Sequence, residues 1–169
     1  GGGERTTPQA VADAMAFYAH IGKRPIQVRR EIKGHIANRL QAALWREAFH
    51  LVNQGVATVE DIDTAISQGP GLRWALMGPF MNLHLSGGDG GIAHLLAHLG
   101  DPIESWWQDL GAPSMTEALR RQVTEGVAQA LGDRRASDLA RARDALLIDL
   151  LRAKQASGLL GQPDPDLDA

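Results

Sequence analysis

Two polar side chains, each a few residues after a glycine, are the strongest candidates for chemistry in this sequence. Asn38 follows Gly34 in the predicted first turns of a helix, and its carboxamide can donate a hydrogen bond to a carbonyl oxygen. Arg73 follows Gly71, and its guanidinium can bind a carboxylate or a phosphate through two parallel hydrogen bonds. Each has a simpler interpretation: Asn38 could bond the local backbone, and Arg73 could stack on Trp74 at the surface.

Three further motifs have the form of a ligand site but lack parts that such a site needs. Glu47 and His50 have the Glu-x-x-His spacing of di-iron bundles, without a second copy of that motif. His94 and His98 lie one helical turn apart, with no glutamate between them and no third ligand implied. Residues 88–93 fit Gly-x-Gly-x-x-Ala but follow a helical pattern rather than a buried strand. We therefore predict neither a metal site nor a cofactor-binding residue in this chain.

The composition excludes several classes of protein. Of the 169 residues, 44% are hydrophobic and 22% charged, which is ordinary for a globular domain. The net charge of −3 argues against a nucleic-acid partner, which would select a basic face. Cysteine is absent, so there is no disulfide framework and no thiolate catalyst. Neither an apolar run long enough for a membrane span nor a signal-peptide pattern occurs, so we expect a cytoplasmic protein without a membrane partner.

The elements that must position Asn38 and Arg73 are predicted to be mostly helices. Helix starts, apolar periodicity and glycine stops indicate helices over residues 8–22, 34–55, 58–68, 72–85, 92–99, 114–131 and 134–156, with interruptions at residues 69–71 and 78–79. Residues 23–29 alternate and predict a single strand, whose backbone groups would have no partner in this chain. The predicted fold is mainly α, a helical bundle preceded by a helix and a strand.

Three stretches resemble a known family. Residues 34–40, Gly-His-Ile-Ala-Asn-Arg-Leu, resemble the signature that opens the C-terminal domain of the 3-hydroxyacyl-CoA dehydrogenase family, with His35 in place of the usual phenylalanine. Residues 71–79 and 87–91 look like those of the branch that contains L-gulonate 3-dehydrogenase (lambda-crystallin) and L-carnitine dehydrogenase. The likeness extends from about residue 4 to residue 126.

This resemblance implies a domain organisation. Residues 1–33 would be the helix-and-strand remnant of a Rossmann-type nucleotide-binding domain that is otherwise missing. Residues 34–157 would be the helical C-terminal domain for substrate binding and dimerisation, and residues 158–169 a disordered tail. The family forms homodimers through these helices, and the adjacent Trp106 and Trp107 fit such an interface.

The resemblance also implies a reaction. Members of the family transfer hydride to NAD from the 3-hydroxyl of a 3-hydroxyacyl-CoA or an L-3-hydroxy acid, such as a gulonate-like or carnitine-like substrate. Asn38 matches an asparagine that positions substrate beside the catalytic histidine, and Arg73 matches an arginine expected to bind the substrate carboxylate. The catalytic His-Pro motif is absent, because isoleucine or leucine follows each of the six histidines. We therefore expect NAD to bind to the missing N-terminal domain, and this chain alone to be inactive.

A second hypothesis stays open. The chain could be a stand-alone helical dimerisation or interaction module without catalysis. A reading frame that continues upstream of Gly1 into a glycine-rich strand-turn-helix would favour the dehydrogenase.

Overall fold

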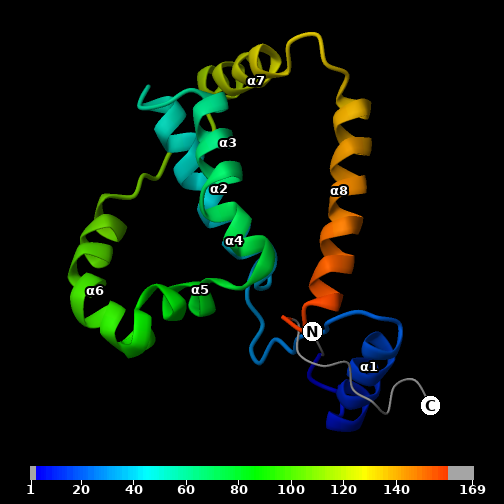
Figure 1. Cartoon of the computed structure of the whole chain (residues 1–169). Coiled ribbons are helices and arrows are strands. Elements are labelled where there is room, and N and C mark those ends of the chain that lie inside the picture. The colour runs from blue at the N-terminus through cyan, green and yellow to red at the C-terminus, as the bar shows by residue number, and fades with distance from the viewer. Residues whose placement is uncertain (1–2, 160–169) are drawn as a thin grey trace. The chain divides into compact units, whose positions relative to one another are not determined.

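The computed structural model describes residues 3–159, and all regular elements in that range are helices (Figure 1). This confirms the prediction of a mainly α fold. The elements are α1 (Pro8–His20), α2 (Ala37–Asn53), α3 (Val59–Gln68), α4 (Pro70–Leu76), α5 (Pro79–Ser86), the 3₁₀ helix η1 (Gly88–Gly90), α6 (Gly91–Asp109), α7 (Glu117–Leu131) and α8 (Ala136–Ala156). Most of the tail predicted to be disordered lies outside the described residues.

The chain divides into two compact units, with the boundary inside α2 after Leu44. The first unit holds α1, an extended segment and the start of α2. The second holds the remainder of α2 and all later helices. Each unit is described separately below.

In the first unit, α1 begins as the sequence predicts. The Thr7 side chain accepts a hydrogen bond from the backbone N–H of Ala10, and Pro8 takes the first helical position. The strand predicted over residues 23–29 is absent. The segment is irregular, with no backbone ladder, because a strand needs a neighbouring strand and no described segment supplies one.

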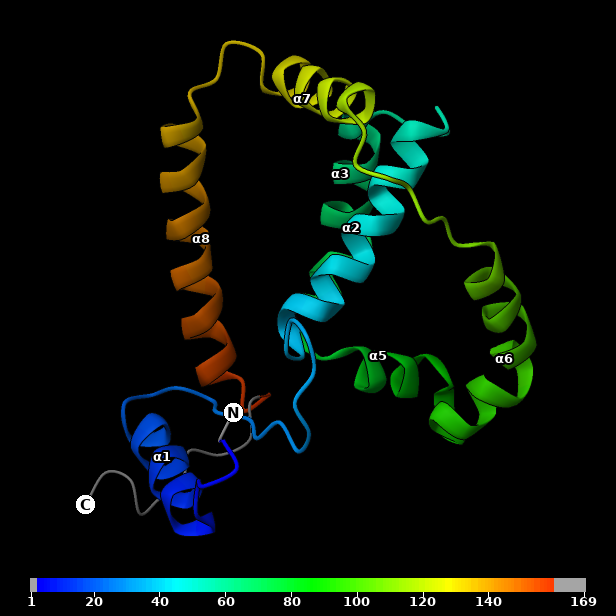
Figure 2. The same ribbon diagram turned by 180° about the vertical axis from the view of Figure 1, so that it is seen from behind.

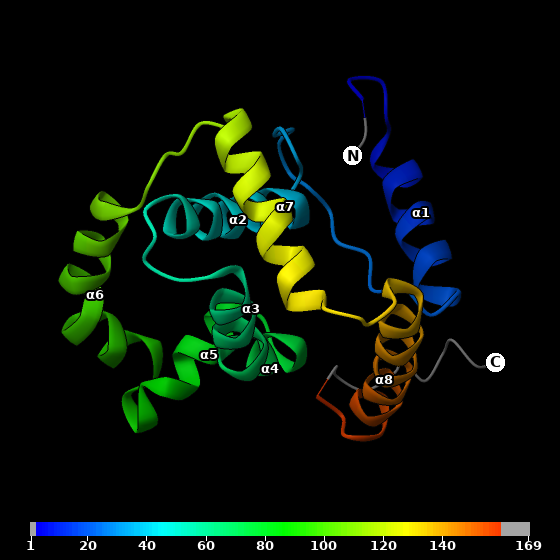
Figure 3. The same ribbon diagram turned by 90° about the horizontal axis from the view of Figure 1, so that it is seen from above.

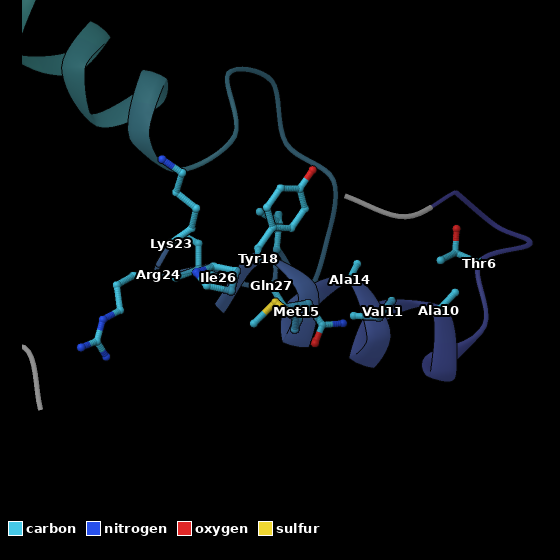
Figure 4. Close-up of a pocket in the computed structure, with 12 residues that line it drawn as sticks. Thr6, Ala10, Val11, Ala14, Met15, Tyr18, Lys23, Arg24, Ile26 and Gln27 are labelled. Carbon is cyan, nitrogen blue, oxygen red and sulfur yellow. The ribbon is translucent and has the colours of Figure 1, made fainter. Parts of the chain in front are cut away.

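A groove lies between α1 and the irregular segment of the first unit (Figure 4). Its volume is about 430 Å³. Val11, Met15 and Tyr18 line it from α1, while Ile26 and Val28 line it from the segment. The alternation that predicted a strand therefore does place apolar side chains against a helix, although no ladder forms.

In the second unit, α3 packs against α4 and α7, and α5 packs against α6. Figure 2 and Figure 3 show α7 beside α3 from two directions. The side chain of Gln122 on α7 donates a hydrogen bond to the carbonyl of Val52 at the end of α2. The buried hydrophobic side chains of the described residues are Val52, Leu95 and Leu119, so the core is small.

Side-chain caps fix the starts of two helices in this unit. Thr58 and Asp61 form a reciprocal capping box at α3, as their spacing predicts. Hydrogen bonds from the hydroxyl and the backbone N–H of Thr58 lower the pKa of the Asp61 carboxyl. Thr116 caps α7 by accepting the N–H of Leu119.

The prediction of a short helix that ends at Gly100 is wrong, because α6 continues through Gly100 and Pro102 to Asp109. A proline inside a helix removes one hydrogen bond and crowds the preceding turn. The apolar spacing continues beyond it from Leu99 to Ile103 and Trp106, so the helix keeps one apolar face. None of the described helices combines the length and the apolar character needed to cross a membrane.

Candidate functional site

Asn38 is the second residue of α2 and lies in the first unit. The turn that leads to it places Gly34 and His35 in the left-handed region, at φ values of 82° and 49°. Asn38 is exposed, and no hydrogen bond of its side chain to another described residue is found. Within the described residues, the carboxamide does not bond the local backbone, and an exposed carboxamide can both donate to and accept from a ligand.

Arg73 belongs to α4, in the second unit. It is exposed, and none of the ion pairs formed by described residues involves it. Stacking of Arg73 on Trp74 is not observed either. A guanidinium in this state can receive a carboxylate in the two-bond geometry.

The joint between α3 and α4 depends on glycines at positions 69 and 71. A Cβ at Gly71 would lie 2.5 Å from the carbonyl oxygen of Ile66, and one at Gly69 would lie 2.4 Å from that of Ala65. Backbone oxygens cannot move away cheaply, so only glycine permits this approach. The glycines that precede Arg73 therefore set the direction in which α4 leaves α3.

Asn82, which the sequence analysis did not single out, fastens the carboxyl end of α4 to α5. Its Nδ2 donates to the carbonyl oxygens of Met77 at 2.9 Å, Gly78 at 3.1 Å and Arg73 at 3.3 Å. Lys154 on α8 contributes a second fastening, because its Nζ donates to the carbonyl oxygen of Ala75 at 2.6 Å. The sequence offers one signal for Asn82, its place shortly after the helix start at Gly78-Pro79. That place does not predict which carbonyl groups its side chain contacts.

The structure does not bring Asn38 and Arg73 into one unit, so each is characterised in its own surroundings. Asn38 can orient an oxygen of a substrate, and Arg73 can hold an anionic group. Neither residue is a proton acceptor at neutral pH, so neither could serve as a general base.

Glu47 and His50 have a structural role. Glu47 Oε2 accepts the backbone N–H of Gly111 at 2.8 Å, and a Cβ at Gly111 would lie 1.9 Å from the ring of His50. The Glu-x-x-His pair thus holds the linker that follows α6. No group of three residues able to hold a metal ion is found within residues 3–159.

The remaining histidine and glycine motifs also pack locally. The rings of His94 and His98 lie with centroids 4.2 Å apart, and His98 Nδ1 is 2.9 Å from the carbonyl oxygen of His94. His84 Nδ1 accepts the backbone N–H of Ile92 at 3.2 Å, and a Cβ at Gly91 would overlap the His84 ring. The glycine run therefore allows the turn from α5 into α6.

Comparison with known proteins identifies relatives over nearly the whole chain. Residues 34–129 match the C-terminal domain of 3-hydroxyacyl-CoA dehydrogenase. The chain is 51% identical to the L-carnitine dehydrogenase of Streptomyces griseus over 152 residues, which make up 90% of this chain and 45% of that protein. It is 49% identical to the L-carnitine dehydrogenase of Pseudomonas aeruginosa over 152 residues, 90% of this chain and 47% of that protein. The chain thus spans about half the length of these curated relatives.

A solved structure is similar as well. It is that of 5-formyl-3-hydroxy-2-methylpyridine 4-carboxylic acid 5-dehydrogenase, an NAD+-dependent dismutase. The TM-score is 0.65 at 26% sequence identity, and the match covers 95% of this chain and 51% of that one. The chain belongs to the 3-hydroxyacyl-CoA dehydrogenase family, with residues 34–129 forming the C-terminal domain of that family.

Proposed function

We propose that this chain is the substrate-positioning and dimerising part of an NAD-dependent L-3-hydroxy-acid dehydrogenase whose substrate is carnitine-like. The observation that carries the proposal is the 51% identity to an L-carnitine dehydrogenase over 90% of the chain. A 3-hydroxyacyl-CoA or a gulonate-like acid is a less favoured substrate, because the similar proteins named above are L-carnitine dehydrogenases. In the proposed reaction the 3-hydroxyl carbon loses a hydride to NAD and the hydroxyl loses a proton.

NAD would bind to a nucleotide-binding domain that this chain does not include. We assign residues 1–33 as the last part of that domain and residues 34–157 as the helical domain. The groove between α1 and residues 23–28 supports the assignment, because apolar side chains line it (Figure 4). Within the described residues, the N–H of Lys23 donates to the carbonyl of Tyr18, and residues 24–28 form no backbone hydrogen bond. A sheet edge from the preceding domain would satisfy that backbone and cover the groove.

The two candidate residues would have different roles toward the substrate. The Asn38 carboxamide would hold the reacting oxygen through a hydrogen bond, which makes it the catalytic candidate in this chain. The Arg73 guanidinium would bind the carboxylate through two charge-assisted hydrogen bonds. The general base and the cofactor contacts would come from the other domain, so this chain alone would not turn over substrate.

We propose that the helical domain forms a homodimer. Trp106 and Trp107 near the end of α6 are 64% and 68% exposed. The last helix, α8, also exposes several apolar side chains, namely Leu139, Leu146, Leu147, Ile148 and Leu151. Large apolar side chains left open on a domain with a small core favour burial against a second copy.

The proposal is tested with the parent enzyme, meaning the polypeptide that joins this chain to a nucleotide-binding domain. NADH formation is followed at 340 nm (the ordinary absorbance assay for this cofactor) with L-carnitine, D-carnitine, L-gulonate and a 3-hydroxyacyl-CoA. We expect turnover with L-carnitine by the parent enzyme and none by residues 1–169 alone. NADH formation by the isolated chain, or a parent enzyme inactive on all four compounds, would contradict the proposal.

The exposed apolar surface also suits a stand-alone interaction module. That alternative predicts a stable helical dimer in solution whose coding frame does not extend into a nucleotide-binding domain. Reading the frame upstream of Gly1 separates the two.

A further inference from the structure

The seven-residue helix α4 carries Arg73, and side chains from other helices hold its carboxyl end. An isolated helix of this length is unstable, because the cost of nucleation exceeds what so few hydrogen bonds return. Its last four carbonyl groups also have no partner inside the helix. The direction of α4, and with it the origin of the Arg73 side chain, therefore depends on contacts with α3, α5 and α8.

Asn82 makes several of these contacts through a single side-chain amide. The two N–H bonds of its amide are shared among the carbonyls of Arg73, Met77 and Gly78, which span the end of α4 and the start of α5. The carbonyl of Arg73 also accepts the backbone N–H of Met77 at 2.9 Å. The backbone oxygen of Arg73 thus accepts two hydrogen bonds, one from the Asn82 amide and one from the N–H of Met77.

These bonds serve α4 rather than α5. An asparagine that stabilises the first turn of a helix accepts hydrogen bonds from the free backbone N–H groups of that turn. Asn82 instead donates, and its three acceptors, the carbonyls of Arg73, Met77 and Gly78, all lie before α5 begins. Its side chain is half-buried, whereas Arg73 and Trp74 are exposed. The joint is therefore fixed next to side chains that remain open to a ligand.

We infer that Asn82 is a positioning residue for substrate binding: it fixes the α4–α5 joint and so aims Arg73 at the substrate carboxylate. This inference rests on the proposed function, because it assigns Asn82 an effect only through Arg73. Lys154 holds the same helix through one hydrogen bond, which its Nζ donates to the carbonyl of Ala75. Displacing a binding group by about 1 Å is enough to lose one to two orders of magnitude in binding or rate.

The test compares the Michaelis constants of variants of the parent enzyme. Asn82→Asp keeps the size of the side chain and replaces the donors by a carboxylate that repels the three carbonyls. Ser86→Ala is the matched control, since Ser86 lies on α5 and bonds only the carbonyl of Asn82. We expect Asn82→Asp to raise KM for the hydroxy acid about tenfold, with kcat and KM for NAD within about twofold of wild type, as for loss of uniform substrate binding.

A double-mutant cycle with Arg73→Ala distinguishes positioning from a purely structural role. If Asn82 acts through Arg73, adding Asn82→Asp to Arg73→Ala changes KM by less than about twofold. Equal effects in both backgrounds, or an unchanged KM for folded Asn82→Asp, would overturn the inference. If Asn82→Asp fails to fold, Asn82→Ser replaces it in the same KM measurements and is judged by the same outcomes. A wild-type parent enzyme that oxidises no hydroxy acid contradicts the proposed function, whereas an active enzyme with an additive cycle contradicts only the role of Asn82.

Discussion

The two candidate residues are supported in contrasting ways. Arg73 stands on a helix whose carboxyl end receives hydrogen bonds from Asn82 and Lys154, which lie on two other helices. Asn38 stands at a helix start shaped by a local turn, with Gly34 and His35 in the left-handed region. The placement of Arg73 therefore depends on residues of the second unit, whereas no described residue hydrogen-bonds the Asn38 side chain. On the roles proposed above, Arg73 would be positioned within its own domain, whereas Asn38 would complete its contacts only in the presence of the nucleotide-binding domain.

The largest expected effect comes from Asn38. In the parent enzyme, Asn38→Ala should lower kcat about 100-fold, because a donor aimed at the reacting oxygen acts most strongly in the transition state. Asn53→Ala is the matched control, since Asn53 is also exposed and ends the same helix. Steady-state NADH formation measures both, and circular dichroism checks the fold. An unchanged kcat in Asn38→Ala would show that Asn38 does not act in catalysis, and the contrast with Arg73 would then have no functional meaning.

The second prediction concerns the rigidity of the second unit. A Cβ at Gly111 would overlap the His50 ring, so Gly111→Ala should destabilise the chain by about 2 kcal/mol, as overpacking does. Gly100→Ala is the control, because a Cβ at Gly100 inside α6 meets nothing within 4 Å. That variant should gain about 0.5 to 1 kcal/mol, since alanine is the better helix former. Urea unfolding measures both, and equal stabilities would show that the linker after α6 is not tightly held.

Lys154 provides a smaller test of how α4 is held. Lys154→Met keeps the aliphatic stem and removes the donor to the carbonyl of Ala75. In the parent enzyme we expect KM for the hydroxy acid to rise about threefold, less than for Asn82→Asp, because one hydrogen bond is lost rather than three. Arg152→Met is the control, since Arg152 only pairs with Asp149 on an exposed face of α8. If both variants raise KM equally, the effect belongs to the charge of α8 and not to α4.

The smallest expected effect is at the turn before Asn38. His35→Gly should change the unfolding free energy by no more than about 1 kcal/mol, because relief of left-handed strain is offset by the greater freedom of the unfolded chain. Gly34→Ala should destabilise by at least as much, since its φ of 82° disfavours any side chain, although the nearest atom to a Cβ there, the backbone nitrogen of Arg39, lies at an ordinary contact distance of 3.4 Å. Thermal unfolding of the two variants gives the comparison. A marked loss in His35→Gly would mean that the imidazole itself supports the turn.

Local signals in the sequence were enough for most helix boundaries. Thr7 before Pro8, Thr58 with Asp61, and Thr116 act within one turn of the chain, so their effect does not depend on distant residues. Family resemblance pointed to Asn38 and Arg73, and their exposed side chains are compatible with the roles proposed for them.

What the sequence did not predict depends on neighbours. The irregular segment at residues 23–28 has the alternation of a strand, but pairing requires a second strand that no described residue offers. Gly100 suggested an end to α6, yet the helix and its apolar face continue past it and past Pro102. The acceptors of Asn82 come together only because α4 and α5 meet at a definite angle, which spacing alone does not specify.

Every acceptor in the Asn82 joint is a main-chain oxygen, and so is the acceptor of Lys154. The hydrogen bonds that hold α4 therefore do not depend on which side chains occupy positions 73, 74 and 77. On the proposed function, substitutions at the exposed positions 73 and 74 would change which compounds bind, while the framework around α4 stays intact. This separation would give evolution, or a protein engineer, a route to new specificity in which Asn82 stays the same.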